Sequence, residues 1–353
     1  MRVGVACRTA GGLVDSRAMD IDYARAGDRA ELLDFLYGVF LRANPNHPRF
    51  EDLFTELFDG TDEAMGRHAV VRVGGRIAAC VGMYRMTLRI AGCDVPLAGI
   101  GQVSTGAEHL GKGYMSALLR EQLARARAEG AAVAWLGGRH DRYSRFGFES
   151  AGLYFVYGLD ARSTREIPLA RHVARLDGNP ADGLPEVVHA LRERGGEIIA
   201  EPRETYLRRL RRTRYEAWTA TPSGASEPDA WALFAPEKNR IDELAGSVDG
   251  CLEIVATLAR QSPGDVTVSR STADRALSEG LRRACHWVSA GMNMLSVLDR
   301  DRLLDAYAPL VPPGTRLPPR DLSPGELARV CFGPELSSFP VRFPFNLPDH
   351  FHI

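Results

Sequence analysis

The feature that most constrains the fold is a strand, a glycine turn and an amphipathic helix in direct succession. "VPLAGIGQVST" (95–105) has the apolar character of a strand, and "EHLGKGYMSALLREQLARA" (108–126) places leucines on one face of a helix. The short apolar run "AAVAWLGG" (131–138) then predicts a buried strand. A helix that joins two strands makes a crossover, so the two strands should lie parallel within a mixed sheet. The sequence therefore predicts an α+β fold.

The segments around this run complete one domain. Gly74-Gly75 separates two strand-like runs and predicts a hairpin. Upstream, Asp28 and Glu31 have the spacing of a capping box and predict the start of a helix. We expect a leader without clear structure, a first domain, a connector with a second and fainter αβ unit, and a short C-terminal segment. Their predicted bounds are 1–18, 19–162, 163–290 and 291–353.

Composition excludes several functional classes. The net charge is −1, and Lys112 and Lys238 are the only lysines, so the arginine clusters reflect a general bias. We therefore expect no affinity for nucleic acid or for anionic membranes. No apolar stretch reaches the roughly 20 residues that span a bilayer, and the N-terminal stretch lacks the apolar core of a signal peptide. The six cysteines have no metal-ligand spacing, and His350 and His352 lack further ligands, so we expect a cytoplasmic protein without a metal.

The glycine turn at 111–113 suits the binding of a phosphate group. At the N-terminus of a helix, main-chain N–H groups point outward and the helix dipole adds partial positive charge. Here the donors would be the amides of Leu110 to Met115, with Lys112 as a neighbouring cation. The dinucleotide pattern GxGxxG and the P-loop lysine with its Ser or Thr are both absent. A turn that merely begins a helix is the alternative.

Two motifs resemble those of the GNAT superfamily of N-acetyltransferases. "VSTGAEHLGKGYMSALL" resembles the coenzyme A-binding motif, with Gly113 at its central glycine, while Leu110 and Met115 depart from the usual pattern. "YSRFGF" (143–148) resembles the Tyr-x-x-x-Gly-Phe stretch after the fifth strand of that superfamily. Its form is typical of the enhanced-intracellular-survival-type subgroup, as is a bulky apolar residue at the position of Met115.

The resemblance implies an architecture. It implies a GNAT fold with a mixed, mostly antiparallel twisted sheet, tandem GNAT-like units and a short C-terminal segment that resembles sterol carrier proteins. No glycine turn of this kind occurs between 206 and 290, so we expect only the first unit to bind coenzyme A.

The resemblance also implies roles for individual residues. Tyr143 would protonate the leaving thiolate, and the terminal carboxylate of Ile353 would act as the base, with Glu108, Asp141 and His140 as lesser candidates. Asp52 and Glu56 would line the acceptor cleft, although a solvated helix face also explains them. The expected contacts of acetyl-CoA, the co-substrate, are Val103, Ser104, Thr105, Leu110, Gly111, Lys112, Gly113, Tyr114 and Met115.

The expected activity is direct acetyl transfer from acetyl-CoA to an amine. Neither motif contains a cysteine, which argues against an acyl-enzyme. The subgroup resemblance implies a small-molecule acceptor, an aminoglycoside-like antibiotic, in resistance or self-protection. Acetylation of protein lysine is one alternative. The departures at Leu110 and Met115 motivate another, a non-catalytic module that binds acyl-CoA. The sequence leaves open whether copies of the chain form a homo-oligomer.

Overall fold

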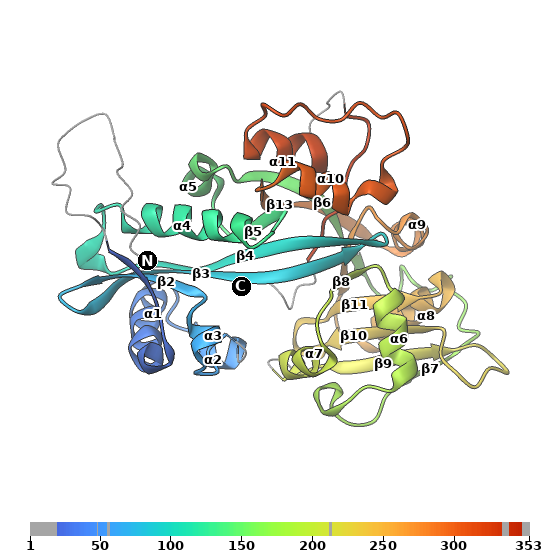
Figure 1. Ribbon diagram of the computed structural model, residues 1–353. Coiled ribbons are helices and arrows are strands. Elements are labelled where there is room, and N and C mark those ends of the chain that lie inside the picture. The colour runs from blue at the N-terminus through green and yellow to red at the C-terminus, as the bar shows by residue number, and fades with distance from the viewer. Residues whose placement is uncertain (1–19, 48, 55–56, 212–213, 334–338, 348–353) are drawn as a thin grey trace. The chain divides into compact units, whose positions relative to one another are not determined.

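The structure is a computed structural model that describes residues 20–47, 49–54, 57–211, 214–333 and 339–347. The chain folds into two compact units. Among the described residues, the first unit contains 20–84 and 99–129, and the second contains 85–98 and 130–347. Two long strands, β3 and β4, contribute residues to both units (Figure 1).

The first unit is a sheet with helices on both faces. Its strands run in the order β1-β2-β3-β4, and Figure 1 shows α1 on one face and α4 on the other. The turn at Gly74-Gly75 joins β2 to β3 as predicted, and Val73 pairs with Arg76 across it. The elements are β1 (Ile21–Tyr23), α1 (Arg29–Ala43), α2 (Phe50–Leu53), α3 (Asp62–Met65), β2 (His68–Val73), β3 (Arg76–Ile90), β4 (Cys93–Thr105) and α4 (Tyr114–Ala128).

The predicted capping box at the start of α1 is wrong. Asp28 is the N-cap residue, but its side chain makes no capping hydrogen bond. Its carboxylate instead accepts a hydrogen bond from the amide of Arg25 at 2.9 Å and pairs with Arg72 at 2.8 Å. Glu31 also pairs with Arg72 and accepts from the amide of Ile77 at 2.8 Å. Both carboxylates therefore tie the helix to neighbouring segments, and that of Asp28 closes the short turn at 25–28 instead of capping α1.

The second unit contains a longer sheet in the order β5-β13-β6-β12-β11-β10-β9-β7, and β8 pairs with the outer part of β3. Most strand pairs are antiparallel; β11 and β12 are parallel and are joined by α8. The elements are β5 (Val133–Leu136), α5 (His140–Tyr143), β6 (Glu149–Leu159), β7 (His172–Arg175), α6 (Glu186–Arg194), β8 (Glu197–Ile199), α7 (Arg203–Leu210), β9 (Glu216–Thr221), β10 (Ala230–Ala235), β11 (Arg240–Gly246), α8 (Val248–Gln261), β12 (Val266–Ser271), α9 (Arg275–Ala284), β13 (Trp287–Val297), α10 (Arg300–Ala306) and α11 (Pro324–Phe332).

Strand β10 is buried on both of its faces. Successive side chains of a strand point to opposite sides of the sheet. Ala232 and Phe234 belong to the core beneath α8 and α9, whereas Trp231 and Leu233 belong to the core beneath α6 and α7. The run "AWALFA" is continuously apolar for this reason, as is typical of strands covered by helices on both sides.

Two buried charged clusters cross-link this unit. Arg192 of α6 is fully buried and donates to Glu243 of β11 at 2.9 Å, and its guanidinium stacks 3.7 Å from the ring centroid of Tyr206. Glu197 of β8 accepts from the amide of Ser271 at 3.1 Å and from the side chain of Asn346 at 3.2 Å. Buried charges need such partners because their desolvation is costly.

The last described residues of the chain belong to the core of the second unit. Tyr307 stacks on Phe343 with 4.2 Å between ring centroids, and its hydroxyl donates to the carbonyl of Pro344 at 2.7 Å. Helix α11 supplies Phe332, whose ring lies edge-on to that of Phe345 at 5.8 Å. Phe345 is fully buried. The short C-terminal segment thus folds as an aromatic cluster around two helices.

The predicted fold class, α+β with a mixed sheet, is confirmed. Sequence patterns located most elements of the second unit but missed three of its strands, β7, β8 and β11. Four of the cysteines, Cys80, Cys93, Cys251 and Cys331, are buried as free thiols. Across the part of the chain that the structure describes, no helix has the length and apolar character needed to cross a bilayer.

Replacing Arg192 with Met should destabilise the second unit strongly. The change leaves the buried carboxylate of Glu243 without its charged partner, a loss that typically costs about 3–5 kcal/mol. The matched control is Arg203→Met, whose partner Glu186 lies at the surface, and we expect at most about 1 kcal/mol there. Urea unfolding followed by circular dichroism measures both, and equal losses in the two variants would refute the role of burial.

Candidate active site

The junction between β4 and α4 is an exposed glycine turn. Gly111 and Gly113 have φ values of 77° and 80°, in the left-handed region that favours glycine. A Cβ atom on either residue would meet no atom of the chain within 4 Å, so backbone conformation and not crowding selects glycine. Leu110, at the start of this turn, is 66% exposed.

The N-terminus of α4 is open to an anion. The first turn closes with a hydrogen bond from the amide of Ala117 to the carbonyl of Gly113 at 3.1 Å, and the amides of Tyr114 and Met115 precede it. No side chain caps this end, and its first turn contains no acidic residue. The positive end of the helix dipole is therefore not neutralised by a carboxylate of the helix itself.

Side chains beside the turn add a cation. The ammonium of Lys112 lies 3.1 Å from Nδ1 of His109. Because an ammonium can only donate, Nδ1 accepts this hydrogen bond. The carboxylate of Glu108 lies 3.6 Å from Nε2 of the same ring. Interactions with its own backbone and with His109 lower the pKa of Glu108, which makes it a weak base.

The end of β4 is bent at Gln102. This buried residue has a φ of 48°, which interrupts the extended backbone within the strand, and we call this left-handed interruption the bulge. Val103 and Thr105 are half-buried, whereas Ser104 is buried and donates its hydroxyl to the carbonyl of Gln102 at 3.0 Å. The predicted contacts at 103–105 therefore lie directly after the bulge.

A buried polar cluster that the sequence did not predict supports the bulge. The hydroxyl of Tyr84 hydrogen-bonds to Oε1 of Gln102 and lies 3.0 Å from Nε2 of His68. Nδ1 of His68 lies 3.1 Å from the carbonyl of Met65. Burial lowers the pKa of His68 to about 4, so its ring is neutral at pH 7. The sequence signal was weak, since these residues come from three separate strands.

Tyr143 lies in the second unit, at the end of α5. It is buried, and its ring lies 6.3 Å from that of Phe148 in an edge-on arrangement. Gly138 leaves room for it, because a Cβ there would overlap the Tyr143 ring. Burial raises the pKa of Tyr143, so the phenol stays protonated at neutral pH. The turn that follows ends at Gly147, with a φ of 85°.

Two lesser candidates for the base are already engaged near Tyr143. Asp141 pairs with Arg139 at 2.7 Å, and this pairing lowers the pKa of Asp141. Nε2 of His140 lies 2.9 Å from the carboxylate of Glu149. Both side chains of each pair stay on or near the surface of this unit.

Residues 20–151 match the family model described as the acetyltransferase (GNAT) domain. This part of the chain is similar to a GNAT acetyltransferase domain. An uncharacterized N-acetyltransferase of Streptomyces coelicolor is 33% identical over 175 residues, which are 46% of this chain and 41% of that protein. The chain thus matches about two fifths of the length of this curated relative.

Solved structures extend the similarity to most of the chain. A GCN5-related N-acetyltransferase from Kribbella flavida superposes with a TM-score of 0.63 at 19% identity, over 81% of this chain and 73% of that one. Eis1 from Mycobacterium abscessus superposes with a TM-score of 0.56 at 19% identity, over 79% and 74%. At this identity the similarity shows the fold, so the fold shared with these proteins reaches well beyond the matched residues 20–151.

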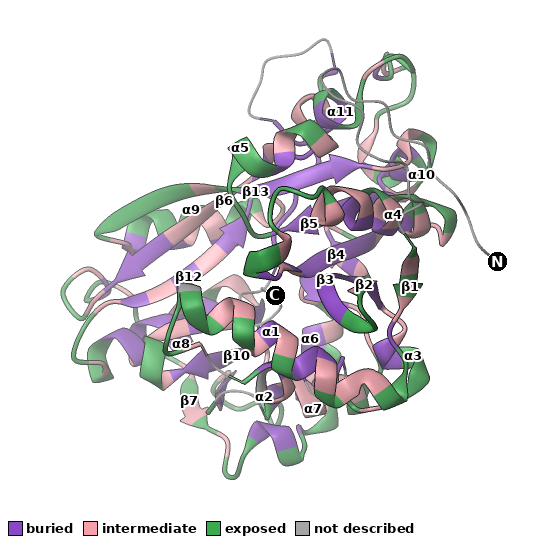
Figure 2. Cartoon of the chain, turned by 90° about the vertical axis from the view of Figure 1, so that its left-hand side faces the viewer, coloured by how far each residue is buried: buried purple, intermediate pink, exposed green. Residues whose placement is uncertain are grey.

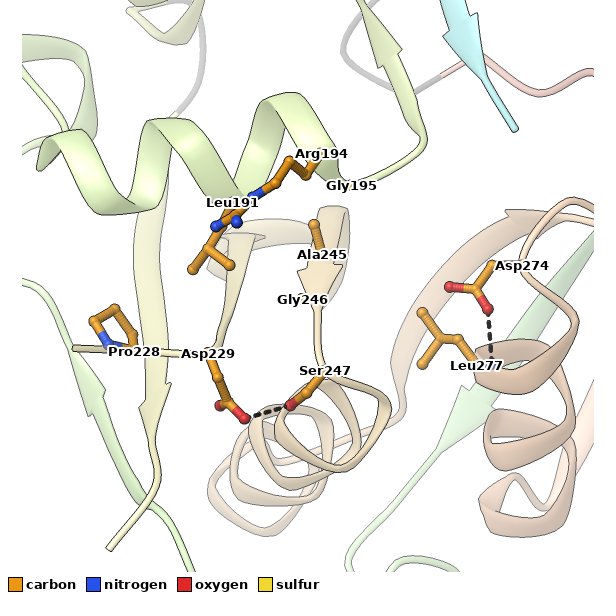
Figure 3. Close-up of a pocket in the computed structure, with 10 residues that line it drawn as sticks. All are labelled: Leu191, Arg194, Gly195, Pro228, Asp229, Ala245, Gly246, Ser247, Asp274 and Leu277. Carbon is orange, nitrogen blue, oxygen red and sulfur yellow. Dashed lines mark hydrogen bonds between the residues drawn. The ribbon is translucent and has the colours of Figure 1, made fainter. Parts of the chain in front are cut away.

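The second unit contains a strand-to-helix junction of the same kind, between β11 and α8, but its chemistry is opposite (Figure 3). Here Ser247 caps the helix by accepting from the amide of Gly250 at 3.1 Å and donates its hydroxyl to Asp229 at 2.7 Å. The first turn also contains Asp249. The adjoining cavity of about 480 Å³ is lined by two carboxylates, Asp229 and Asp274, and by one guanidinium, Arg194. This junction is therefore unsuited to a phosphate group.

One cluster in the second unit has the composition of a metal site. Ligand atoms of Asp160, Asp265 and His286 all lie within 4.8 Å of one another. Each ring nitrogen of His286 faces a carboxylate, at 4.0 Å and 3.3 Å, and Asp265 also accepts from the indole of Trp287 at 2.8 Å. These three side chains therefore contact one another, and Asp265 is also bound by Trp287.

Several predicted site residues lie outside the described structure. These are Glu56 and Ile353, together with His350 and His352. Asp52 lies in α2, although nothing is described of its side chain. Among the described residues, 103–105 and 110–115 come together at one end of the first unit, and Tyr143 belongs to the second.

The low pKa of His68 predicts a stability loss in acid. An unfolded histidine titrates near 6.5, so between pH 6.5 and 4 the unfolded chain binds a proton that the folded chain does not. Stability should therefore fall as the pH is lowered through this window, by about 3 kcal/mol from this residue. Urea unfolding of wild type and His68→Gln from pH 7 to 4 measures the difference. Parallel curves for the two proteins would contradict it.

Proposed function

We propose that this protein is an acetyl-CoA-dependent N-acetyltransferase that transfers the acetyl group directly to a primary amine of a small molecule. The observation that carries the proposal is the uncapped N-terminus of α4 behind Gly111 and Gly113, inside a segment that matches a GNAT acetyltransferase family. The N-acetyltransferase of Streptomyces coelicolor supports the same reaction class.

In this mechanism the amides of Gly111 to Met115 hold the diphosphate of the coenzyme, and Lys112 adds positive charge. Oriented main-chain donors suit this group because their dipoles are fixed before binding. The pantetheine arm follows the backbone of Val103, Ser104 and Thr105. Leu110 offers an exposed apolar side chain beside the turn, where the superfamily has a polar residue.

The amine attacks the thioester carbonyl, the C–S bond breaks, and the thiolate leaves with a proton from Tyr143. The raised pKa of Tyr143 keeps this proton in place until the thiolate forms. The carboxylate of Ile353 accepts the proton of the attacking amine, directly or through a water molecule, by resemblance to the subgroup. Cys80 is fully buried in the first unit, and burial raises its pKa strongly, which disfavours an acyl-cysteine.

The proposed acceptor is an aminoglycoside-like antibiotic, with Asp52 and Glu56 as its acidic wall. Polycationic amines favour a cleft lined by carboxylates. The resemblance of the "YSRFGF" turn to that of the enhanced-intracellular-survival-type subgroup supports this choice. The chain also shares its fold with Eis1 from Mycobacterium abscessus.

Thiol release from acetyl-CoA across a panel of aminoglycosides, other small amines and lysine peptides tests the reaction. We expect turnover with an aminoglycoside. Tyr143→Phe should lower kcat by about 100-fold, the lower range for loss of a general acid, with the Kd for CoA unchanged by calorimetry. A preference for peptides would favour protein lysine as the acceptor. Binding of CoA without turnover on any amine would favour a non-catalytic acyl-CoA-binding module and overturn the proposal.

Replacing Gly113 with Ala should weaken the binding of CoA by about tenfold or more. The change strains the backbone at φ 80° and displaces amides that hold the diphosphate. Gly92→Ala is the matched control, because Gly92 has a φ of 75° in the turn between β3 and β4 and no atom near an added Cβ. Calorimetry with CoA should show an unchanged Kd for Gly92→Ala. Equally weakened CoA binding in Gly113→Ala and Gly92→Ala would show that the turn at 111–113 does not bind the diphosphate.

A further inference from the structure

The backbone at Gln102 has a conformation that L side chains rarely adopt. Among the described residues, three others than glycine have a positive φ: Ala91, Gln102 and Asn239. Ala91 occupies a hairpin turn and Asn239 follows a 3₁₀ turn, whereas Gln102 lies inside a strand and is buried. A left-handed residue within a strand persists when its surroundings hold it there.

Two contacts hold Gln102 from opposite ends. Its side-chain Oε1 accepts a hydrogen bond from the hydroxyl of Tyr84, and its main-chain carbonyl accepts one from the hydroxyl of Ser104 at 3.0 Å. Gly82 makes room for the first contact, because a Cβ on Gly82 would overlap the Tyr84 hydroxyl and the Gln102 amide. The glycine at position 82 of β3 therefore leaves the space that the contact between Tyr84 and Gln102 needs.

His68 lies against the Tyr84 hydroxyl, whose single proton is donated to Gln102. Its Nε2 lies 3.0 Å from that oxygen, and its Nδ1 lies 3.1 Å from the carbonyl of Met65, next to the end of α3. His68 and Tyr84 are 0% and 3% exposed. A core that needed only packing would hold apolar rings here, since each buried polar atom must be matched by a partner. The cluster runs instead from α3 through two strands and ends on the bulge.

We propose that His68 and Tyr84 are positioning residues that hold the bulge at Gln102 and thereby align the main chain of 103–105 with the acetyl thioester. The inference rests on the proposed function, because that function makes acetyl-CoA the ligand of the main chain at 103–105. His68 and Tyr84 touch neither substrate nor cofactor, and act through Gln102. Replacing them should therefore reduce the preference for acetyl-CoA over CoA. It should not change the affinity for the diphosphate, which the turn at 111–113 binds.

Calorimetry of Tyr84→Phe with acetyl-CoA and with CoA tests this division. The variant should lose most of the wild-type preference for acetyl-CoA over CoA, at least fivefold, while the Kd for CoA stays within twofold. In the thiol-release assay, kcat should fall at least tenfold. If the wild type binds neither acetyl-CoA nor CoA, the proposed function is wrong. If both ligands bind and Tyr84→Phe keeps the wild-type preference for acetyl-CoA, only the positioning role is wrong.

A rescue variant separates positioning from simple loss of stability. Glycine adopts a positive φ without strain, so Gln102→Gly should keep the bulge when its support is removed. The double variant Tyr84→Phe/Gln102→Gly should therefore recover the preference for acetyl-CoA and most of kcat. The matched control is Tyr23→Phe, which removes a hydrogen bond of 3.0 Å to Glu121 in the same unit and should leave both ligand affinities unchanged. No recovery in the double variant, or an equal loss of preference in Tyr23→Phe, would overturn the proposal.

Discussion

Main-chain amides at the start of a helix need hydrogen-bond partners. The two units differ in which groups supply these partners where a strand leads into a helix. At α4 the glycine turn leaves the first amides facing outward, without a capping side chain or an acidic first turn. At α8 the side chain of Ser247 fills the same role, and Asp229 lies behind it. One fold motif thus presents an electropositive end in the first unit and a neutralised end in the second. This difference in capping is why we assign the diphosphate of the coenzyme to the start of α4 and not to the start of α8.

The interior of the first unit combines two kinds of packing. Beneath α1, apolar side chains such as Leu32, Leu36 and Phe58 fill the core. Deeper along β4 the polar cluster of His68, Tyr84 and Gln102 takes over, where the strand departs from regular geometry. Polar groups in a core specify one arrangement because each has few possible partners. Apolar packing holds the unit together, while the polar cluster fixes the shape of one short segment.

Local patterns were predictable from the sequence wherever local chemistry decides the structure. The hairpin at Gly74-Gly75 and the helix after Gly113 follow from turn residues and from apolar periodicity. Strand β11 was missed because Glu243 looks like a surface residue until its partner Arg192, 51 positions earlier, is known. Asp28 likewise does not cap α1, because its carboxylate binds the amide of Arg25 and the guanidinium of Arg72.

Only part of the candidate site was predictable from the sequence. The turn at 111–113 and Tyr143 were found from motifs of a few neighbouring residues. The cluster that ends at Gln102 was not, because it depends on a bulge and on contacts between residues 16 and 18 positions apart. No residue-by-residue propensity encodes such a bulge, since tertiary partners stabilise it.

The carboxylate of Glu197 joins β8 to β12 and to Asn346. These partners lie 74 and 149 positions further along the chain. During synthesis the ribosome therefore releases β8 long before the last group that neutralises it exists. Until the chain has been translated past Asn346, a nascent second unit carries a charge without its full shell of donors. We thus expect this unit to complete its folding only after Asn346 has been translated.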